Sequence, residues 1–153
     1  ALSDSRIIIN NVKMPPEDLA NKFFDKIDCF VFPTHGEGFG LPPLEAMAMG
    51  KCVICTNYSG CADYLDSKFS LPLGFKEVPA PLSEVMGYPE ELRADGQLWA
   101  EPDFNELVDK MRWTYSNQKE SNKLGIKAKR FVRTYWSNKK AASKLLKYLE
   151  FKF

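Results

Sequence analysis

The 153-residue sequence predicts an α/β fold in which a parallel, Rossmann-like sheet is flanked by helices. Three short apolar runs are typical of buried strands, and two segments with helical apolar spacing lie between them. A chain that alternates strand, helix, strand, helix and strand forms a parallel sheet, because each helix carries the chain back across the sheet.

The three predicted strands are bounded by residues that commonly end strands. They are "RIIIN" at 6–10, "DCFVFPT" at 28–34 and "KCVICTN" at 51–57. Between them, "PPEDLANKFFDKI" opens with a helix-start pattern, and "PPLEAMAMG" has Gly50 at the position of a C-terminal cap. Three strands are fewer than the roughly five or six of a doubly wound sheet, so we expect the sequence to be truncated at its N-terminus.

The pattern changes after the third strand. Residues 69–100 combine prolines and glycines without a regular period, which predicts an irregular insertion. Asp103 and Glu106 then resemble a capping box, and helices are expected over about 103–151. The expected inward-facing residues are Leu107, Met111 and Tyr115, then Leu124, Ala128, Phe131 and Tyr135, then Ala142, Leu145, Leu146 and Leu149, with Lys123, Lys127 and Arg130 outside. We interpret residues 1–153 as a single partial domain.

Charge is distributed unevenly along the chain. The net charge is +1, but residues 1–118 hold 10 basic and 18 acidic side chains, whereas residues 119–153 hold 11 basic and 2 acidic ones. A basic tail of this kind suits an acidic partner, or it is the solvated outer face of packed helices. The second interpretation is favoured over nucleic acid, and peripheral contact with a membrane through the basic helices stays open.

Several classes of protein are disfavoured by composition. No apolar run approaches the ~20 residues of a membrane-spanning helix, and the start lacks the layout of a signal peptide, so we expect a cytoplasmic protein. The cysteines, Cys29, Cys52, Cys55 and Cys61, are expected to be reduced and buried. "CVIC" has the spacing of half a zinc site, but strand alternation would point its two thiols to opposite faces.

The loop of residues 34–41 follows the second predicted strand, where ligands bind in open parallel sheets. Gly36, Gly38 and Gly40 permit close approach of the backbone to a ligand. The loop leads into the N-terminus of a helix, whose unpaired amides favour phosphate. The expected donors are the amides of Phe39, Gly40, Leu41 and Leu44.

Glu37 lies in this loop and Glu45 lies near the start of the following helix. Carboxylates aimed at a phosphate would repel it, whereas they are strong acceptors for sugar hydroxyls beside it. The alternative is that Glu45 only complements the helix dipole and Glu37 is solvated. The two glutamates together with the glycine loop favour a sugar nucleotide as the ligand. His35, the only histidine, is a further candidate for phosphate or acceptor binding, although a lone loop histidine is more often structural.

The run "HGEGFGLPPLEAMAMGKCVIC" resembles the glutamate, seven residues, glutamate signature of retaining GT-B glycosyltransferases of group 1, or family 4-like, in their C-terminal domain. The resemblance implies a nucleotide-diphospho-sugar donor held by this domain, an acceptor held by an N-terminal domain, and transfer with retention. It assigns Glu37 to the donor sugar as the catalytic residue and Glu45 to the ribose. It places Gly38, Phe39, Gly40 and Leu41 at the sugar and diphosphate, Asn11 and Val12 at the base, and Thr56 near the nucleotide.

The resemblance also indicates what this sequence lacks. The basic residues that neutralise the diphosphate in these enzymes belong to a segment without a counterpart here, so we expect the fragment alone to be inactive. The family implies no metal or other cofactor, and no Asp-x-Asp pattern occurs. Acceptors in such families include polysaccharides and glycolipids.

Two alternatives from other classes remain. A glycoside hydrolase also uses paired carboxylates, although it has no need for a phosphate-binding loop. A non-catalytic module that binds nucleotide or an anionic membrane would use the basic tail as its main contact.

Overall fold

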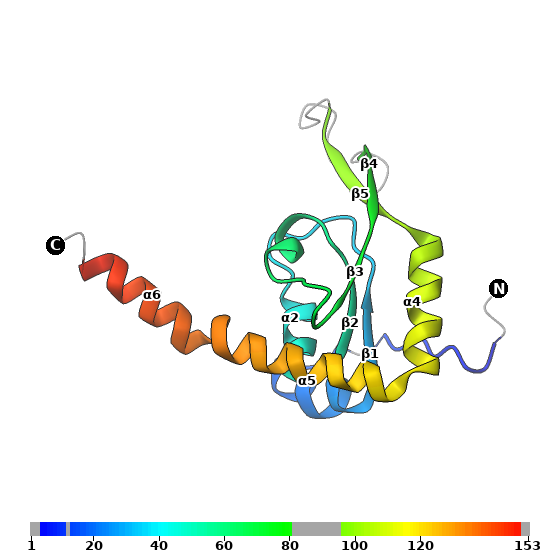
Figure 1. Ribbon diagram of the computed structural model, residues 1–153, viewed down its shortest axis with the longest axis horizontal. Coiled ribbons are helices and arrows are strands. Elements are labelled where there is room, and N and C mark those ends of the chain that lie inside the picture. The colour runs from blue at the N-terminus through cyan, green and yellow to red at the C-terminus, as the bar shows by residue number, and fades with distance from the viewer. Residues whose placement is uncertain (1–3, 12, 81–95, 151–153) are drawn as a thin grey trace.

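The computed structural model describes residues 4–11, 13–80 and 96–150 of the chain. Its centre is a parallel sheet of strands β1 (Cys29–Phe32), β2 (Cys52–Thr56) and β3 (Leu71–Leu73), in the order β1-β2-β3. Helices lie on both sides of this sheet (Figure 1). The predicted α/β, Rossmann-like fold is confirmed.

Both helices predicted between the strands are present. The first is an irregular helical segment, made of α1 (Pro16–Asp18), η1 (Leu19–Phe23) and η2 (Phe24–Lys26). The second is α2 (Leu41–Ala48), which starts directly after the loop that follows β1. A short turn of helix, η3 (Ser59–Asp63), then follows β2. Helix α2 thus connects β1 to β2, and η3 lies between β2 and β3, whereas the first helical segment precedes β1.

Alternation along β2 gives the sheet two different faces. Val53 and Cys55 belong to the core formed with Leu44 and Met47 of α2. Ile54, which points the other way, lines a small hollow beneath helix α4 (Phe104–Ser116). All residues of β2 are buried, as expected for the central strand of a covered sheet.

Helix α5 (Gln118–Tyr135) packs closely against the end of α2. Gly50 has φ of +82° and its amide donates to the Met47 carbonyl, so its predicted role in ending α2 is confirmed. A Cβ atom on Gly125 would lie 2.0 Å from the Gly50 carbonyl oxygen. Glycine at residue 125 therefore lets the two backbones meet.

The first predicted strand is wrong. Residues 7–10 have no regular structure, and Ile8 is 86% exposed. A strand needs a neighbour to pair with its backbone, and none of the described strands pairs with this segment. A β-branched run therefore indicates a strand only where the fold supplies that neighbour.

The predicted irregular insertion at 69–100 is also partly wrong. It contains β3, and its two ends form an antiparallel hairpin of β4 (Phe75–Pro79) and β5 (Leu98–Pro102), which projects from the sheet (Figure 1). Residues 81–95 of this prediction lie outside the described residues. Pro79 and Pro102 each end a strand, where the missing N–H interrupts no ladder. Pro72 lies within the edge strand β3, so the described prolines of this segment are compatible with strands at an edge or a strand end.

The predicted helix stripes are only partly correct. Asp103 caps α4, since its Oδ1 accepts from the Glu106 amide at 3.0 Å, but Met111 and Tyr115 of the same helix are exposed. In α5, Ala128 is buried and Tyr135 is exposed, and Val132 takes the inner position near the end of the helix. Leu124 and Phe131 are half-buried, while Lys123, Lys127 and Arg130 are exposed as predicted.

Helix α6 (Asn138–Glu150) extends away from the body of the chain (Figure 1). Leu145, Leu146 and Leu149, predicted to face inward, are exposed, as is Ala142. Helical spacing creates an apolar face, but only a neighbouring element can bury it. None of the helices in the described part of the chain combines the length and the apolar composition that a membrane span requires.

The four cysteines are free thiols, as predicted. Cys52, Cys55 and Cys61 are buried and Cys29 is half-buried. Cys29 and Cys52 are register partners on β1 and β2. A hydrogen bond with Cys52, together with burial, raises the pKa of the Cys29 thiol, which keeps it protonated.

Candidate functional site

The loop of residues 33–40 leaves the C-terminal end of β1 and enters α2 through Gly40, as predicted. Gly40 has φ of +79°, and a Cβ atom there would collide with the Cys61 thiol and the Tyr64 hydroxyl. The Tyr64 hydroxyl donates to the Gly40 carbonyl at 2.5 Å. Burial, with the neighbouring Cys61, raises the pKa of Tyr64, so the hydroxyl keeps the proton that it donates.

Glu37 is held in place through its backbone. Its amide donates to Ser59 Oγ at 2.8 Å, and its carbonyl accepts from Ser59 Oγ at 3.0 Å and from the Gly60 amide at 3.1 Å. Ser59 has φ of +48°, an unfavourable conformation for a residue with a side chain. The Glu37 carboxylate is half-buried and accepts a weak hydrogen bond from Thr34 Oγ1 at 3.4 Å.

A row of backbone amides is available at the end of this loop. The amides of Gly38, Phe39, Gly40 and Leu41 donate no hydrogen bond to any acceptor among the described residues. A Cβ atom on Gly38 would meet nothing within 4 Å. The loop thus presents unpaired donors beside open space at the N-terminus of a helix, which is the arrangement that favours an anion.

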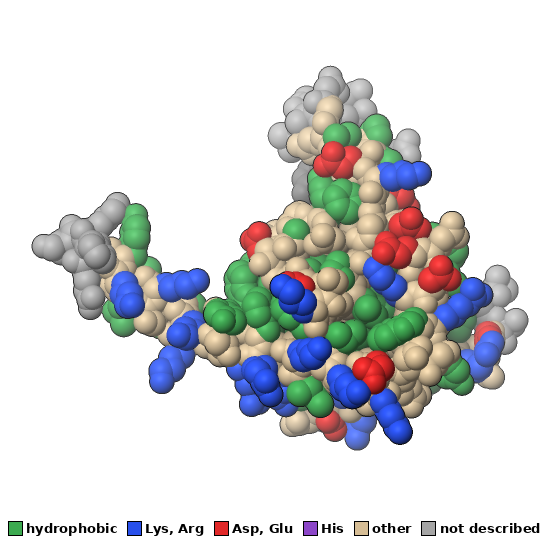
Figure 2. Space-filling model, viewed as in Figure 1, with side chains coloured by type: hydrophobic (Ala, Val, Ile, Leu, Met, Phe, Trp, Pro, Cys, Tyr) green, Lys and Arg blue, Asp and Glu red, His purple; other side chains and the backbone are tan. Residues whose placement is uncertain are grey.

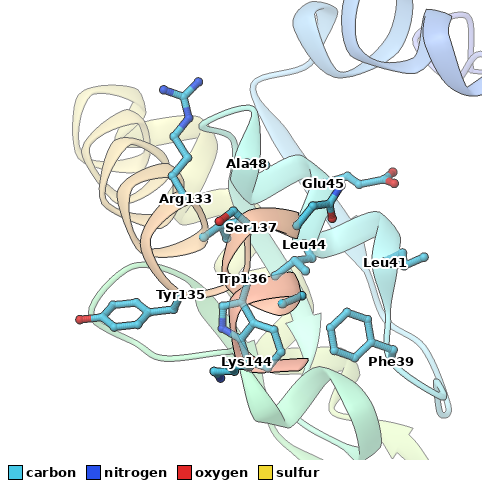
Figure 3. A pocket seen from close by; sticks show the side chains of 13 residues that line it. Phe39, Leu41, Leu44, Glu45, Ala48, Arg133, Tyr135, Trp136, Ser137 and Lys144 are labelled. Carbon is cyan, nitrogen blue, oxygen red and sulfur yellow. The ribbon is translucent and has the colours of Figure 1, made fainter. Parts of the chain in front are cut away.

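Glu45 projects from α2 on the rim of a hollow of about 670 Å³ (Figure 3). Phe39, Leu44 and Trp136 surround the hollow, and the Phe39 and Trp136 ring centroids are 5.5 Å apart. Glu45 also borders a smaller hollow of about 210 Å³ against the first helical segment. Glu37 lines neither of them, and along the chain the two glutamates flank the row of amides.

The described residues predicted to lie near the nucleotide are not brought to either hollow. Asn11 is exposed and outside both hollows, and Val12 lies outside the described residues. Thr56 is fully buried, and its Oγ1 has no hydrogen-bond partner in the described part of the chain. A direct contact of the Thr56 side chain with a nucleotide therefore requires a change from this conformation.

His35 is bound to the hairpin. Its Nδ1 lies 2.8 Å from the Ala100 carbonyl oxygen, and its ring stacks on Trp99 with centroids 4.0 Å apart. The structural role that the sequence favoured for this histidine is thus present.

Several residues that hold the site were missed by the sequence interpretation: Ser59, Tyr64, Trp99 and Trp136. A partial signal existed for the first two, because "YSGCADYL" directly follows a predicted strand whose end reaches the same edge of the sheet. Trp99 and Trp136 belong to segments far along the chain, and no spacing rule connects them to the loop. Among residues 4–11, 13–80 and 96–150, no group of three or more metal-ligating side chains is placed to hold an ion.

Comparison with known proteins identifies related sequences. Residues 1–72 match the family model of glycosyl transferases group 1. The capsular polysaccharide biosynthesis glycosyltransferase CapM of Staphylococcus aureus is 49% identical over 41 residues, which are 27% of this chain and 11% of that protein. The serotype-specific mannosyltransferase WbdA of Escherichia coli is 25% identical over 119 residues, 76% of this chain and 13% of that protein.

A further relative is the D-inositol 3-phosphate glycosyltransferase of Segniliparus rotundus, 32% identical over 98 residues, which are 59% of this chain and 22% of that protein. The chain thus spans between 11% and 22% of the length of these relatives. The segment matched by the family contains the whole β1–α2 loop with Glu37 and Glu45. The parallel sheet of the chain, with helices on both sides, is consistent with one of the two domains of a GT-B enzyme. Residues 1–72, slightly less than half of the chain, thus resemble the glycosyl transferases group 1, and the fold is consistent with a GT-B-type half domain.

Proposed function

We propose that this chain is the donor-binding side of a retaining glycosyltransferase that uses a nucleotide-diphospho-sugar. The observation that carries the proposal is the row of unpaired amides at 38–41, which Glu37 precedes and Glu45 follows along the chain. The amides suit the diphosphate, and the carboxylates suit hydroxyl groups at its two ends.

The assignment of the two glutamates follows from their surroundings. Glu37, held by Ser59, is proposed to contact the transferred sugar, and Glu45 is proposed to accept from the ribose hydroxyls. Phe39 and Leu41 contribute amides to the diphosphate, with Gly38 giving room for close approach. Asn11, Val12 and Thr56 are proposed to be near the nucleoside.

In the proposed reaction, the bond between the anomeric carbon and the diphosphate oxygen breaks as the acceptor oxygen bonds to the same face of that carbon. The acceptor proton passes to the departing diphosphate oxygen. Amides that stabilise the leaving charge supply the main catalytic effect, and no bound metal is required. The acceptor, a polysaccharide, glycolipid or related glycoconjugate, is proposed to be held by an N-terminal domain of the same protein, without which the fragment is inactive.

Calorimetric titration of the chain with UDP, GDP, ADP and their sugar conjugates tests the proposal. One nucleotide should bind, and Glu45→Gln should weaken it about 10- to 100-fold, because a hydrogen bond to a charged acceptor is lost. Glu120→Gln is the matched control, since this glutamate pairs only with the exposed Lys123 on α5. Absence of nucleotide binding both in the chain and in a protein that includes the further domain would reject the proposal.

A second proposal concerns peripheral membrane contact, favoured by α6. Lys and Arg side chains gather along α5 and α6 (Figure 2), and Leu145 and Leu146 are each 59% exposed on α6. A helix with exposed apolar and basic side chains suits an anionic lipid surface. Flotation with phosphatidylserine vesicles should show binding that decreases with salt, and absence of such binding would reject this contact.

A further inference from the structure

The β4–β5 hairpin is attached directly to the loop that carries Glu37. The backbones of His35 and Ala100 are joined by a hydrogen bond of 2.9 Å from the Ala100 amide to the His35 carbonyl. The Ala100 carbonyl lies 2.8 Å from His35 Nδ1, and the Trp99 ring is stacked on the imidazole with an interplanar angle of 12°. Glu101 Oε2 also lies 3.7 Å from Nδ1, so four contacts hold this histidine.

The hairpin is itself fixed to the rest of the fold. At its base, the Gly74 amide donates to Glu106 Oε2 at 2.6 Å, and the Asp103 amide donates to the Gly74 carbonyl at 2.9 Å. On its side, Phe75 packs on Tyr58 with ring centroids 4.9 Å apart. The position of His35 is therefore set by α4 and the hairpin as well as by its own loop.

The hydrogen bond to Ala100 defines the tautomer of the neutral imidazole. A backbone carbonyl only accepts hydrogen bonds, so Nδ1 must carry the proton. In the neutral ring, Nε2 then has a lone pair, and it has no hydrogen-bond partner among the described residues. The side chain is 43% exposed, and its loop reaches Glu37 two residues later. An exposed acceptor thus lies on the same loop as the proposed sugar-binding glutamate, two residues before it.

We infer that the hairpin makes His35 a sugar-binding residue, with Nε2 accepting a hydrogen bond from a hydroxyl of the transferred sugar, and that Trp99 is the positioning residue for this ring. The inference rests on the proposed function and adds the group that His35 recognises. A neutral Nε2 is an acceptor, so it suits a hydroxyl and cannot donate to a diphosphate. His35 is therefore assigned to the transferred sugar and not to the diphosphate.

The tautomer is directly measurable, because His35 is the only histidine of the chain. Long-range ¹H–¹⁵N correlations of histidine-labelled protein, under mildly alkaline conditions, should show a neutral ring protonated at Nδ1. Trp99→Leu should shift the resonances toward a mixture of tautomers. Trp113→Leu is the matched control, since Trp113 lies on α4 and is exposed. A ring protonated at Nε2, or an unchanged spectrum in Trp99→Leu, would overturn the inference.

Ligand addition separates this inference from the proposed function. The sugar nucleotide should move the Nε2 resonance, whereas the corresponding nucleoside diphosphate should not. His35→Phe should reduce the affinity for the sugar nucleotide relative to the diphosphate about fivefold, and His35→Gln, which retains an acceptor oxygen, should restore part of it.

The possible results are distinct. Nucleotide binding that depends on Glu45, combined with equal responses of Nε2 to both ligands, would overturn the role of His35 and leave the donor site standing. Absence of any nucleotide binding would overturn both.

Discussion

Ser59 and Glu37 are joined by a reciprocal pair of hydrogen bonds. Ser59 Oγ accepts from the Glu37 amide at 2.8 Å and donates to the Glu37 carbonyl at 3.0 Å. The two residues are 22 positions apart, and the serine has φ of +48°. One side chain thus holds the backbone of the proposed catalytic glutamate, at the cost of local strain.

Ser59→Ala should destabilise the folded chain by about 1 kcal/mol and weaken sugar-nucleotide binding, because both hydrogen bonds to Glu37 are lost. Ser59→Gly loses the same bonds but relieves the positive φ, so it should be less destabilising. Urea unfolding and calorimetry measure the two effects. Ser116→Ala, at the exposed end of α4, is the control. Equal stability of Ser59→Ala and the parent would contradict the importance of this pair.

Two glycines of the site should respond oppositely to alanine. Gly38→Ala should leave the free energy of unfolding within about 0.5 kcal/mol of the parent, since its Cβ would meet open space, and should weaken ligand binding by filling that space. Gly60→Ala should destabilise by about 1 to 3 kcal/mol or more, because its Cβ would lie 2.5 Å from the Gly38 carbonyl oxygen. Thermal unfolding of both variants, with binding measured for Gly38→Ala, checks this. Full affinity in Gly38→Ala would mean that the ligand lies elsewhere.

Thr56→Val should be neutral or stabilise the chain by up to about 1 kcal/mol. The Thr56 hydroxyl is buried without a partner among the described residues, so its removal abolishes a desolvation penalty and keeps the shape of the side chain. Chemical unfolding curves provide the measurement. Cys52→Ala in the same strand is a packing control and should destabilise the chain, because Cys52 is a buried thiol. A clear loss of stability in Thr56→Val would reveal a hydrogen-bond partner of the hydroxyl.

Glu106→Gln should destabilise the chain at neutral pH but not in acid. The hydrogen bond from Lys110 at 2.5 Å, and then that from the Gly74 amide, lower the pKa of Glu106 below its ordinary value of 4.5. The carboxylate therefore stabilises the fold above pH 4.5, and this contribution is lost as the pH falls through the lowered pKa of the folded state. Unfolding free energies of variant and parent, measured across this range, should converge in acid.

If the unfolding free energies of Glu106→Gln and the parent differed by the same amount at every pH, the charge of Glu106 would not be the cause of the destabilisation. Glu120→Gln, measured over the same pH range, is the control, because the exposed ion pair of Glu120 and Lys123 contributes little to the stability of the fold.

The central elements were predictable because local sequence determines them. The apolar runs that became β1 and β2, the helix spacing of α2, the glycine that ends it and the Asp103 cap are all properties of short segments. The candidate site was predictable to the same extent, since the glycine loop and both glutamates belong to one continuous stretch between β1 and β2. Because β1 and β2 are parallel, the loop at the start of that stretch lies at the edge of the sheet where ligands bind in such folds.

What the sequence by itself determined is therefore the position of the glycine loop and its two glutamates between β1 and β2, together with the elements that carry them. Tertiary structure alone decided that the 7–10 run joins none of the described sheets, that the ends of the proline-rich segment form a hairpin, and that α6 extends with its leucines exposed. It also decided that Ser59 holds Glu37 and that Ala100, 65 residues along the chain, holds His35. Pairing, burial and side-chain orientation depend on a partner from a distant segment, and periodicity within one segment carries no information about that partner.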